Sequence, residues 1–212
     1  MRRRLSSLIG LLGLLGLMLT PALALAGDLR GDRASDLDGA VLDELNQART
    51  HPYDYAQGLR RQWRPSDPDA EYANGAADDP RALNEAIVFL ERQRPLKPLR
   101  QDPRLAAAAQ GHAALQGPRG EVGHAGIDGA SLSQRLQREG VWAGLSGENI
   151  SYGYADARDV VRQLIIDSGV AGRGHRQNIF DPAYSAAGVG CGRHRVYGAM
   201  CVIDFAGAIV VR

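Results

Sequence analysis

The sequence predicts an α+β fold with a largely antiparallel sheet. Two observations carry this prediction. The first two thirds of the 212-residue chain contain several segments with apolar residues at helical spacing, and the last third contains two strand-like segments that form a hairpin. Strands and helices do not alternate in the way that indicates βαβ units, and no internal repeat is present. The length suits one domain with extensions.

The N-terminus has the features of a secretory signal peptide. Three arginines, Arg2 to Arg4, precede a 12-residue apolar run from Leu8 to Leu19, and Ala24-Leu25-Ala26 forms a small-x-small cleavage signature. The run is shorter than the roughly 20 residues that span a bilayer. We therefore expect residues 1–26 to be removed by a cut after Ala26, which leaves a secreted or periplasmic protein with no stable membrane span. An uncleaved anchor is the alternative.

Charge and cysteine content narrow the function classes. The chain has 25 basic and 24 acidic residues, and removing residues 1–26 removes three arginines and no acid, so the mature chain has 22 basic and 24 acidic residues and a net charge of −2. This balance argues against a nucleic-acid partner, because such binding depends on a basic surface. Cys191 and Cys201 both remain after processing, and two cysteines in an exported chain favour one disulfide.

The first half of the mature chain reads as helices joined by polar segments. Residues 27–36 are polar and are expected to be loose. Helical spacing of apolar residues then predicts a helix over 37–49, and Pro52 suits the first turn of a short helix over 53–63. Residues 64–79 are rich in Pro, Asp and Ala and have no apolar period, which indicates a loop insertion. Further helices are predicted over 81–94 and 104–115, with an extended joint at 96–99.

The second half leads from a glycine-rich loop to the hairpin. Residues 117–129 form that loop, and Ser131 begins a capping box for a helix that runs to about 139. A strand is predicted over 147–152, and a helix capped by Asp156 follows it. Strands over 187–191 and 197–205 form a hairpin around a polar Arg193-His194-Arg195 tip, across which Cys191 and Cys201 can face each other if the register permits. The domain is expected to cover residues 37–207, with 208–212 as a C-terminal end.

Four ionisable residues lie in three glycine-flanked segments and at one helix end. These residues are His124, Glu148, Asp167 and His175. Two imidazoles and two carboxylates suit zinc or another divalent cation, and a zinc site with an open position would allow Glu148 to act as a general base. The separations of 24, 19 and 8 residues match no compact ligand motif, so a hydrogen-bonded structural cluster is the alternative interpretation.

At these residues the chain resembles the CAP superfamily, the cysteine-rich secretory, antigen 5 and pathogenesis-related proteins with SCP-like domains. The resemblance rests on a set of short motifs in a fixed order, over roughly Leu37 to Gly207. The motifs are Gly123-His124, Gly147-Glu148-Asn149-Ile150, Gly174-His175-Arg176-x-Asn178-Ile179, and Gly188-Val189-Gly190-Cys191 with Val202-Ile203-Asp204-Phe205-Ala206.

The resemblance implies an α-β-α sandwich with a cleft formed by two histidines and two acidic residues. His124, Glu148 and His175 match three of these positions. The family's other acid follows a tryptophan by three residues, whereas this chain has Leu164 and Asp167. Because the aspartate side chain is shorter, we expect Asp167 to orient a metal-coordinating residue through a hydrogen bond and not to contact the metal itself. Some members of the family bind zinc through the two histidines, others bind sterols or fatty acids, and several act through protein partners.

Two functional interpretations follow. The first is a secreted, non-enzymatic binding module for a small lipid, an envelope component or a protein partner, whose His/acid cleft holds a divalent metal through His124 and His175 or holds none. The second is a metal-dependent hydrolase of peptides or esters that uses His124, His175 and Glu148. The missing tryptophan, the aspartate and the absence of a complete catalytic motif favour the first.

Overall fold

The computed structural model describes residues 23–62 and 79–210, so the apolar run of the leader and most of the expected insertion at 64–79 lie outside the described residues. The helices are α1 (Leu23–Thr50), α2 (Pro52–Gln62), α3 (Pro80–Arg92), α4 (Pro103–Gln116), α5 (Leu132–Arg138), α6 (Ala157–Ile166) and α7 (Gly174–Ile179), with short 3-10 turns η1 (Gly117–Arg119) and η2 (Ala171–Arg173). The strands are β1 (Arg100–Gln101), β2 (Trp142–Ala143), β3 (Ser146–Tyr152), β4 (Ala186–His194), β5 (Gly198–Ala206) and β6 (Ile209–Val210).

Local capping signals explain where several helices begin. Asp79, Asp102 and Asp156 each accept a hydrogen bond from a backbone N–H in the first turn of α3, α4 and α6. Ser131 and Gln134 form the predicted capping box of α5. These helices therefore begin within one residue of the positions predicted from the sequence.

The sheet is built on the predicted hairpin. Its strand order is β1-β4-β5-β3, with β4 antiparallel to β5, β5 antiparallel to β3, and the two-residue strand β1 parallel to β4. Strands β2 and β6 form a separate two-stranded sheet. Because β4 and β5 are the two central strands, every layer of the fold packs on residues from the hairpin.

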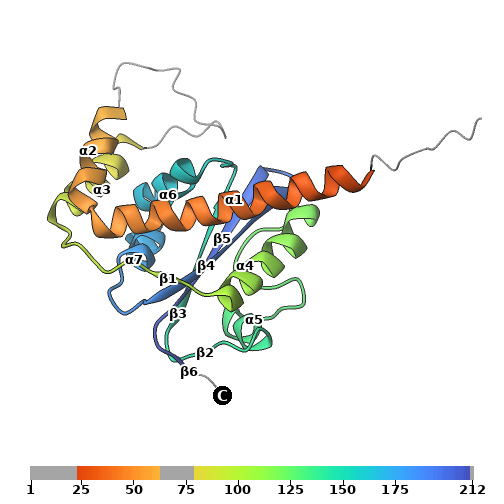
Figure 1. Ribbon diagram of the computed structural model, residues 1–212. Coiled ribbons are helices and arrows are strands. Elements are labelled where there is room, and N and C mark those ends of the chain that lie inside the picture. Colours follow the sequence, from red (N-terminus) through yellow and green to blue (C-terminus); the bar gives the residue numbers. More distant parts are fainter. Residues whose placement is uncertain (1–22, 63–78, 211–212) are drawn as a thin grey trace, which may run out of the picture.

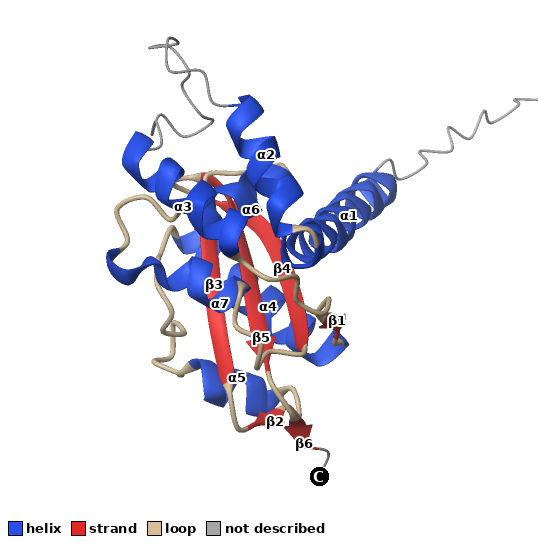
Figure 2. Ribbon diagram, turned by 90° about the vertical axis from the view of Figure 1, so that its left-hand side faces the viewer, coloured by secondary structure: helices blue, strands red, loops and turns tan. Residues whose placement is uncertain are grey.

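Helices cover both faces of the sheet, which makes a three-layer α-β-α sandwich and confirms the predicted fold class (Figures 1 and 2). One face packs against α1, α3, α6 and α7 through residues such as Val189, Ile203 and Phe205. The other face packs against α4 and α5. A Cβ on Gly188 or Gly190 would collide with the backbone of α4, so these two glycines allow α4 to lie directly on β4.

The disulfide prediction is confirmed. Cys191 and Cys201 are directly paired across β4 and β5, and their Cα atoms are 4.0 Å apart. The bond lies on the face covered by α1, where the backbone N–H of Cys191 donates to the carboxylate of Asp38 at 2.7 Å. At its other end α1 is held by Arg49, whose guanidinium donates to the carbonyl oxygen of Tyr184, just before β4. Helix α1 therefore runs alongside β4 over most of its length.

Three expectations differ from the structure. The segment 27–36, expected to be loose, belongs to α1, which begins at Leu23. The polar hairpin tip is shifted, because β4 continues through His194 and the turn is formed by residues 195–197; His194 is buried, with its Nε2 hydrogen-bonded to the carbonyl oxygen of Glu121 at 2.9 Å. Helix α7 was not predicted. Within the described residues, no helix has the length and apolar content needed to cross a bilayer.

Candidate functional site

His124 and Glu148 form the first of two histidine–carboxylate pairs. His124 lies in the glycine-rich loop after η1, and Glu148 lies on the edge strand β3, with its side chain on the face covered by α4 and α5. The His124 Nδ1 is 2.8 Å from Glu148 Oε1. Arg135 of α5 completes the pair, because its guanidinium donates to Glu148 Oε2 and, at 2.7 Å, to the backbone carbonyl of His124.

Electrostatics favour charged forms of both members of this pair. The hydrogen bond to Glu148 raises the pKa of His124 above its usual value, although burial opposes the shift. Burial alone would raise the pKa of Glu148, but the hydrogen bond with His124 and the charge of Arg135 outweigh it and hold the pKa below its usual value. The carboxylate of Glu148 is only 2% exposed, whereas the side chain of His124 is 60% exposed.

Asp167 and His175 form the second pair. Asp167 ends α6 in the left-handed conformation, with φ of 57°, which turns its carboxylate toward the start of α7. One carboxylate oxygen is 2.7 Å from His175 Nδ1, and the other accepts the backbone N–H of His175 at 2.9 Å and that of Arg176 at 3.4 Å. The aspartate that replaces the family's expected acid therefore orients a histidine and its loop.

The two pairs flank the edge strand β3. Adjacent residues of a strand point to opposite faces, so Glu148 points toward α4 and α5 while Asn149 points toward α7. The amide of Asn149 donates to the carbonyl oxygen of His175 at 3.0 Å, and the amide of Asn178 donates to Asn149 Oδ1 at 2.9 Å and to the carbonyl oxygen of Glu148 at 3.3 Å. These bonds join the four predicted site residues into one network around β3.

The donor set does not fit a tightly held zinc ion. Both carboxylates are engaged by histidine Nδ1 atoms, which leaves only the Nε2 atoms of His124 and His175 as protein ligands. Catalytic zinc sites use three protein ligands and structural sites four. Across residues 23–62 and 79–210, no group of three or more His, Cys, Asp or Glu side chains is arranged to hold a metal ion.

Three further residues lie around the His124–Glu148 pair, and the sequence did not predict them as site residues. Arg135, described above, is 7% exposed. His112 is buried on α4, where its Nε2 bonds the carbonyl oxygen of Gly123 at 3.1 Å, and burial lowers its pKa. Asp204 is fully buried on β5, directly across from Glu148.

Asp204 is the least expected of these residues. Among the described residues, neither of its carboxyl oxygens accepts a hydrogen bond. Burial and the negative charge of Glu148 raise its pKa well above the usual range. Both effects favour the protonated form of Asp204, whose O–H can donate to Glu148. A lone acid within the apolar run from Val202 to Phe205 was the available sequence signal, but only the strand register places it opposite Glu148.

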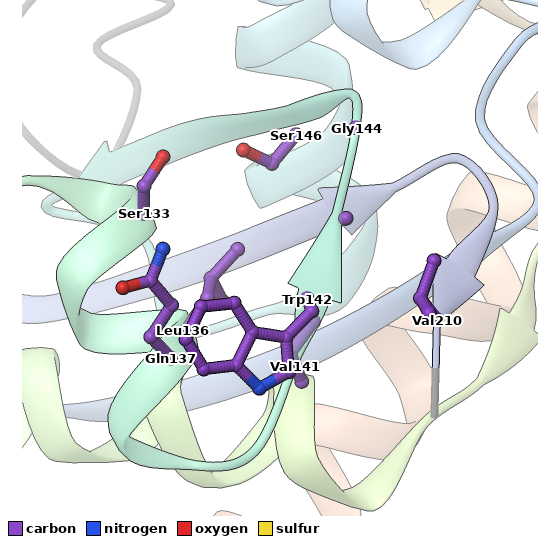
Figure 3. Close-up of a pocket in the computed structure, with 9 residues that line it drawn as sticks. Ser133, Leu136, Gln137, Val141, Trp142, Gly144, Ser146 and Val210 are labelled. Carbon is purple, nitrogen blue, oxygen red and sulfur yellow. The ribbon is translucent and has the colours of Figure 1, made fainter. Parts of the chain in front are cut away.

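A pocket of about 260 Å³ opens beside this cluster, on the same side of the sheet (Figure 3). It is adjacent because Ser146 lies two residues before Glu148 on β3 and Leu136 follows Arg135 on α5. The described residues that line it are uncharged: Ser133, Leu136, Gln137, Val141, Trp142, Ala143, Gly144, Ser146 and Val210. Figure 3 shows the Trp142 ring at the pocket, with the polar groups of Ser133 and Gln137 near it.

Comparisons with known proteins found similar solved structures and one matching family model. Solved structures that resemble this chain include an extracellular protein containing an SCP domain from Bacillus anthracis, at 25% identity and a TM-score of 0.47 over 58% of this chain and 37% of that chain. An outer surface protein from Borrelia burgdorferi matches at 18% identity and a TM-score of 0.44, over 53% of this chain and 79% of that one. A cysteine-rich secretory protein from Staphylococcus aureus matches at 18% identity and 0.43, over 61% and 39%.

This chain thus spans well under half of the Bacillus and Staphylococcus proteins. No curated protein matches it. The model of the CAP family, described as the cysteine-rich secretory protein family, matches residues 42–205, which is more than half of the chain. The match includes both histidine–carboxylate pairs and both cysteines. The chain belongs to the CAP, or cysteine-rich secretory protein, family.

Proposed function

We propose that this chain is a secreted, non-enzymatic binding module that takes the uncharged part of a small lipid or envelope component in the Trp142 pocket. The observation that carries the proposal is the contrast between two neighbouring sites. The described residues that line the pocket carry no ionisable side chain, whereas the charges of the adjacent His124 cluster are paired with one another.

The pairing in the cluster argues against a catalytic carboxylate. Both oxygens of Glu148 are engaged, one by His124 and one by Arg135. A general base needs a free oxygen within reach of the proton that it removes. Asp167 is also fully engaged, by the ring and backbone of His175 and the backbone of Arg176. Both carboxylates are therefore better placed to fix loops than to activate water.

The pocket has the composition of a small-molecule site. Leu136, Val141 and Trp142 supply apolar surface, and Ser133, Gln137 and Ser146 supply hydrogen-bonding groups. Ligand sites commonly combine an apolar lining with a few polar groups that fix orientation, and about 260 Å³ lies just below their usual size range. The expected ligand portion is therefore short, such as the end of an acyl chain or a single sugar ring.

Secretion and metal binding belong to the same proposal. The leader features of residues 1–26 support export to an oxidising compartment, where the Cys191–Cys201 bond is stable. Zinc or another divalent cation, if bound, would be held by the Nε2 atoms of His124 and His175, with Glu148 and Asp167 orienting the rings. Two protein ligands predict weak and reversible binding.

The experiment that tests pocket binding uses tryptophan fluorescence. The chain has two tryptophans, so Trp63→Phe leaves Trp142 as the only reporter. Decanol and decanoate are titrated as matched neutral and charged probes. We expect decanol to bind at least as tightly as decanoate, because no cationic side chain among the described residues lines the pocket to pair with a carboxylate. Tighter binding of decanoate than of decanol, or no response to either decanol or N-acetylglucosamine, would contradict the proposal.

Variants locate the site. Removing a hydrogen-bonding group by Gln137→Ala should weaken N-acetylglucosamine binding about five- to tenfold. Gln110→Ala, which removes an exposed glutamine from α4, is the matched control and should leave affinity unchanged. The hydrolase alternative is tested separately. Stoichiometric zinc in the purified protein, with peptide or ester turnover that is lost in His124→Ala/His175→Ala, would establish that alternative and overturn the non-enzymatic assignment.

A further inference from the structure

Exposed apolar side chains gather at one end of the molecule. Four of the eight large apolar side chains that are exposed in the described part of the chain lie there: Leu115 (47% exposed), Val122 (57%), Val196 (64%) and Tyr197 (49%). Three exposed arginines lie at the same end of the molecule: Arg119 and Arg195, which are joined by a hydrogen bond, and Arg193, near the end of β4. We call these seven residues the tip patch. They come from the end of α4, the η1 turn and the loop after it, the end of β4, and the β4–β5 turn.

Hydrogen bonds and ring contacts hold the tip patch in shape. The backbone N–H of Arg195 donates to the carbonyl oxygen of Gly117 at 2.8 Å, which joins the hairpin turn to η1. The three-residue turn is followed by Gly198, the first residue of β5, whose φ of 81° is the left-handed conformation that such hairpin connections favour. The Tyr197 ring lies 5.6 Å from that of Tyr152 and 5.1 Å from that of the buried His194. The exposed groups are therefore displayed on a fixed surface.

The arginines of the tip patch carry uncompensated charge. Within the described ranges, none of the three forms an ion pair. Arg195 donates to the carbonyl oxygen of Arg119 at 2.6 Å and Arg119 to that of Leu115 at 2.8 Å, so backbone carbonyls orient these two guanidinium groups. The three arginines and Glu121, the exposed acid on the same loop, together have a net charge of +2. This contrasts with −2 for residues 27–212 as a whole.

The chain enters the domain from the same end. Helix α1 contacts the start of β4 through Arg49 and the later part of β4 through Asp38, so its more N-terminal residues continue toward the hairpin turn and past it (Figure 1). The apolar run from Leu8 to Leu19 precedes α1 by only a few residues. A chain held at a bilayer by that run, before processing or as an anchor, would present the tip patch to the membrane.

We propose that the tip patch docks this protein on an anionic bilayer surface. A convex turn with Val196 and Tyr197 at its apex suits insertion among lipid headgroups, where tyrosine is favoured. The flanking arginines suit contact with phosphate oxygens, because guanidinium groups bind phosphate through paired hydrogen bonds. A protein partner would have to supply a cavity for this apex, and nothing in the structure favours that occupant. The proposal is independent of ligand binding in the Trp142 pocket.

Vesicle flotation tests the proposal. The protein without residues 1–26 is mixed at low salt with vesicles of phosphatidylcholine alone or with vesicles that also contain about 30 mol% phosphatidylglycerol, which supplies a negative surface potential. We expect it to float only with the anionic vesicles and to be released as salt screens the attraction. Each arginine near such a surface contributes about fivefold in binding. Arg193→Glu should therefore reduce the partition coefficient at least fivefold, and Tyr197→Ser should also reduce it.

Matched controls at the other end of α1 guard against a general effect of charge. Arg94→Glu makes the same charge change at an exposed site near the α3–β1 joint, and Tyr53→Ser removes an equally exposed tyrosine from α2. Both should bind vesicles like the wild type. Circular dichroism melting of all four variants establishes that each is folded. Failure of the wild type to bind anionic vesicles, or equal losses in the Arg94 and Arg193 variants, would overturn the proposal.

Discussion

Replacing Asp38 by asparagine should stabilise the protein at neutral pH. Asp38 accepts the Cys191 N–H at 2.7 Å, but burial outweighs this bond and raises its pKa from 3.8 to about 6. Such a rise corresponds to at most about 3 kcal/mol of lost stability once the group is ionised. Because the side chain is partly exposed, solvent screening reduces the expected effect to about 1.5 kcal/mol. Asparagine keeps an oxygen for the Cys191 N–H and cannot ionise.

The sign of the effect fixes its pH dependence. A carboxyl whose folded pKa is raised contributes stability below its unfolded pKa and loses it as pH rises through the folded pKa. The wild type and Asp38→Asn should therefore be equally stable near pH 4, diverge up to about pH 6, and differ by a constant amount above it. Urea unfolding followed by circular dichroism at a series of pH values measures this difference.

A second substitution on the same helix serves as the control for Asp38. Asp43→Asn removes one negative charge from an exposed position of α1, away from the Cys191 N–H. It should not reproduce the divergence between pH 4 and 6. If Asp38→Asn is instead less stable than the wild type at pH 7.5, the charged hydrogen bond to Cys191 outweighs burial and the reasoning fails.

Other substitutions test the carboxyl pair, the glycine contacts and the disulfide. In the wild type, the free energy of unfolding should fall with rising pH by about 1.4 kcal/mol per pH unit where Asp204 keeps a proton only in the folded state. Asp204→Asn should remove this slope. An unchanged slope in urea unfolding would rule out a protonated Asp204. Gly190→Ala should cost about 2 kcal/mol or more, because its Cβ meets the backbone of Gln110, whereas Gly111→Ala, which meets nothing, should not destabilise the protein. Reducing the Cys191–Cys201 bond should lower the melting temperature, with a cost of about 2.7 kcal/mol for a loop of this length. A Cys191→Ser/Cys201→Ser variant should melt like the reduced protein.

Much of the fold could be predicted because its signals are local. Asp102, Ser131 and Asp156 begin helices by bonding backbone N–H groups two or three residues away, so a short stretch of sequence contains the whole signal. The hairpin is local in the same way, and pairing Cys191 with Cys201 follows from its register. Strands β1, β2 and β6 were not predictable. Each is only two residues long, which is too short for an alternating pattern, and each is defined by pairing with a strand that is distant in sequence.

The candidate site was predictable only in part. The motifs identified His124, Glu148, Asp167 and His175, and the structure pairs His124 with Glu148 and His175 with Asp167. The sequence did not indicate which carboxylate serves which histidine, because that depends on the faces of β3. Arg135 and Asp204 were missed for a related reason: their contact with Glu148 joins three separate elements, and one arginine among 24 gives no signal by itself.

The position of the central strands in the chain has a consequence for the order in which the domain folds. Both helical layers rest on β4 and β5, yet these strands follow all seven described helices in sequence. Until the hairpin has been synthesised, the helices have no sheet to cover and α4 has no glycine surface to lie on. The helical layers therefore complete their packing last, and the Cys191–Cys201 bond can form only after almost the whole domain has been made.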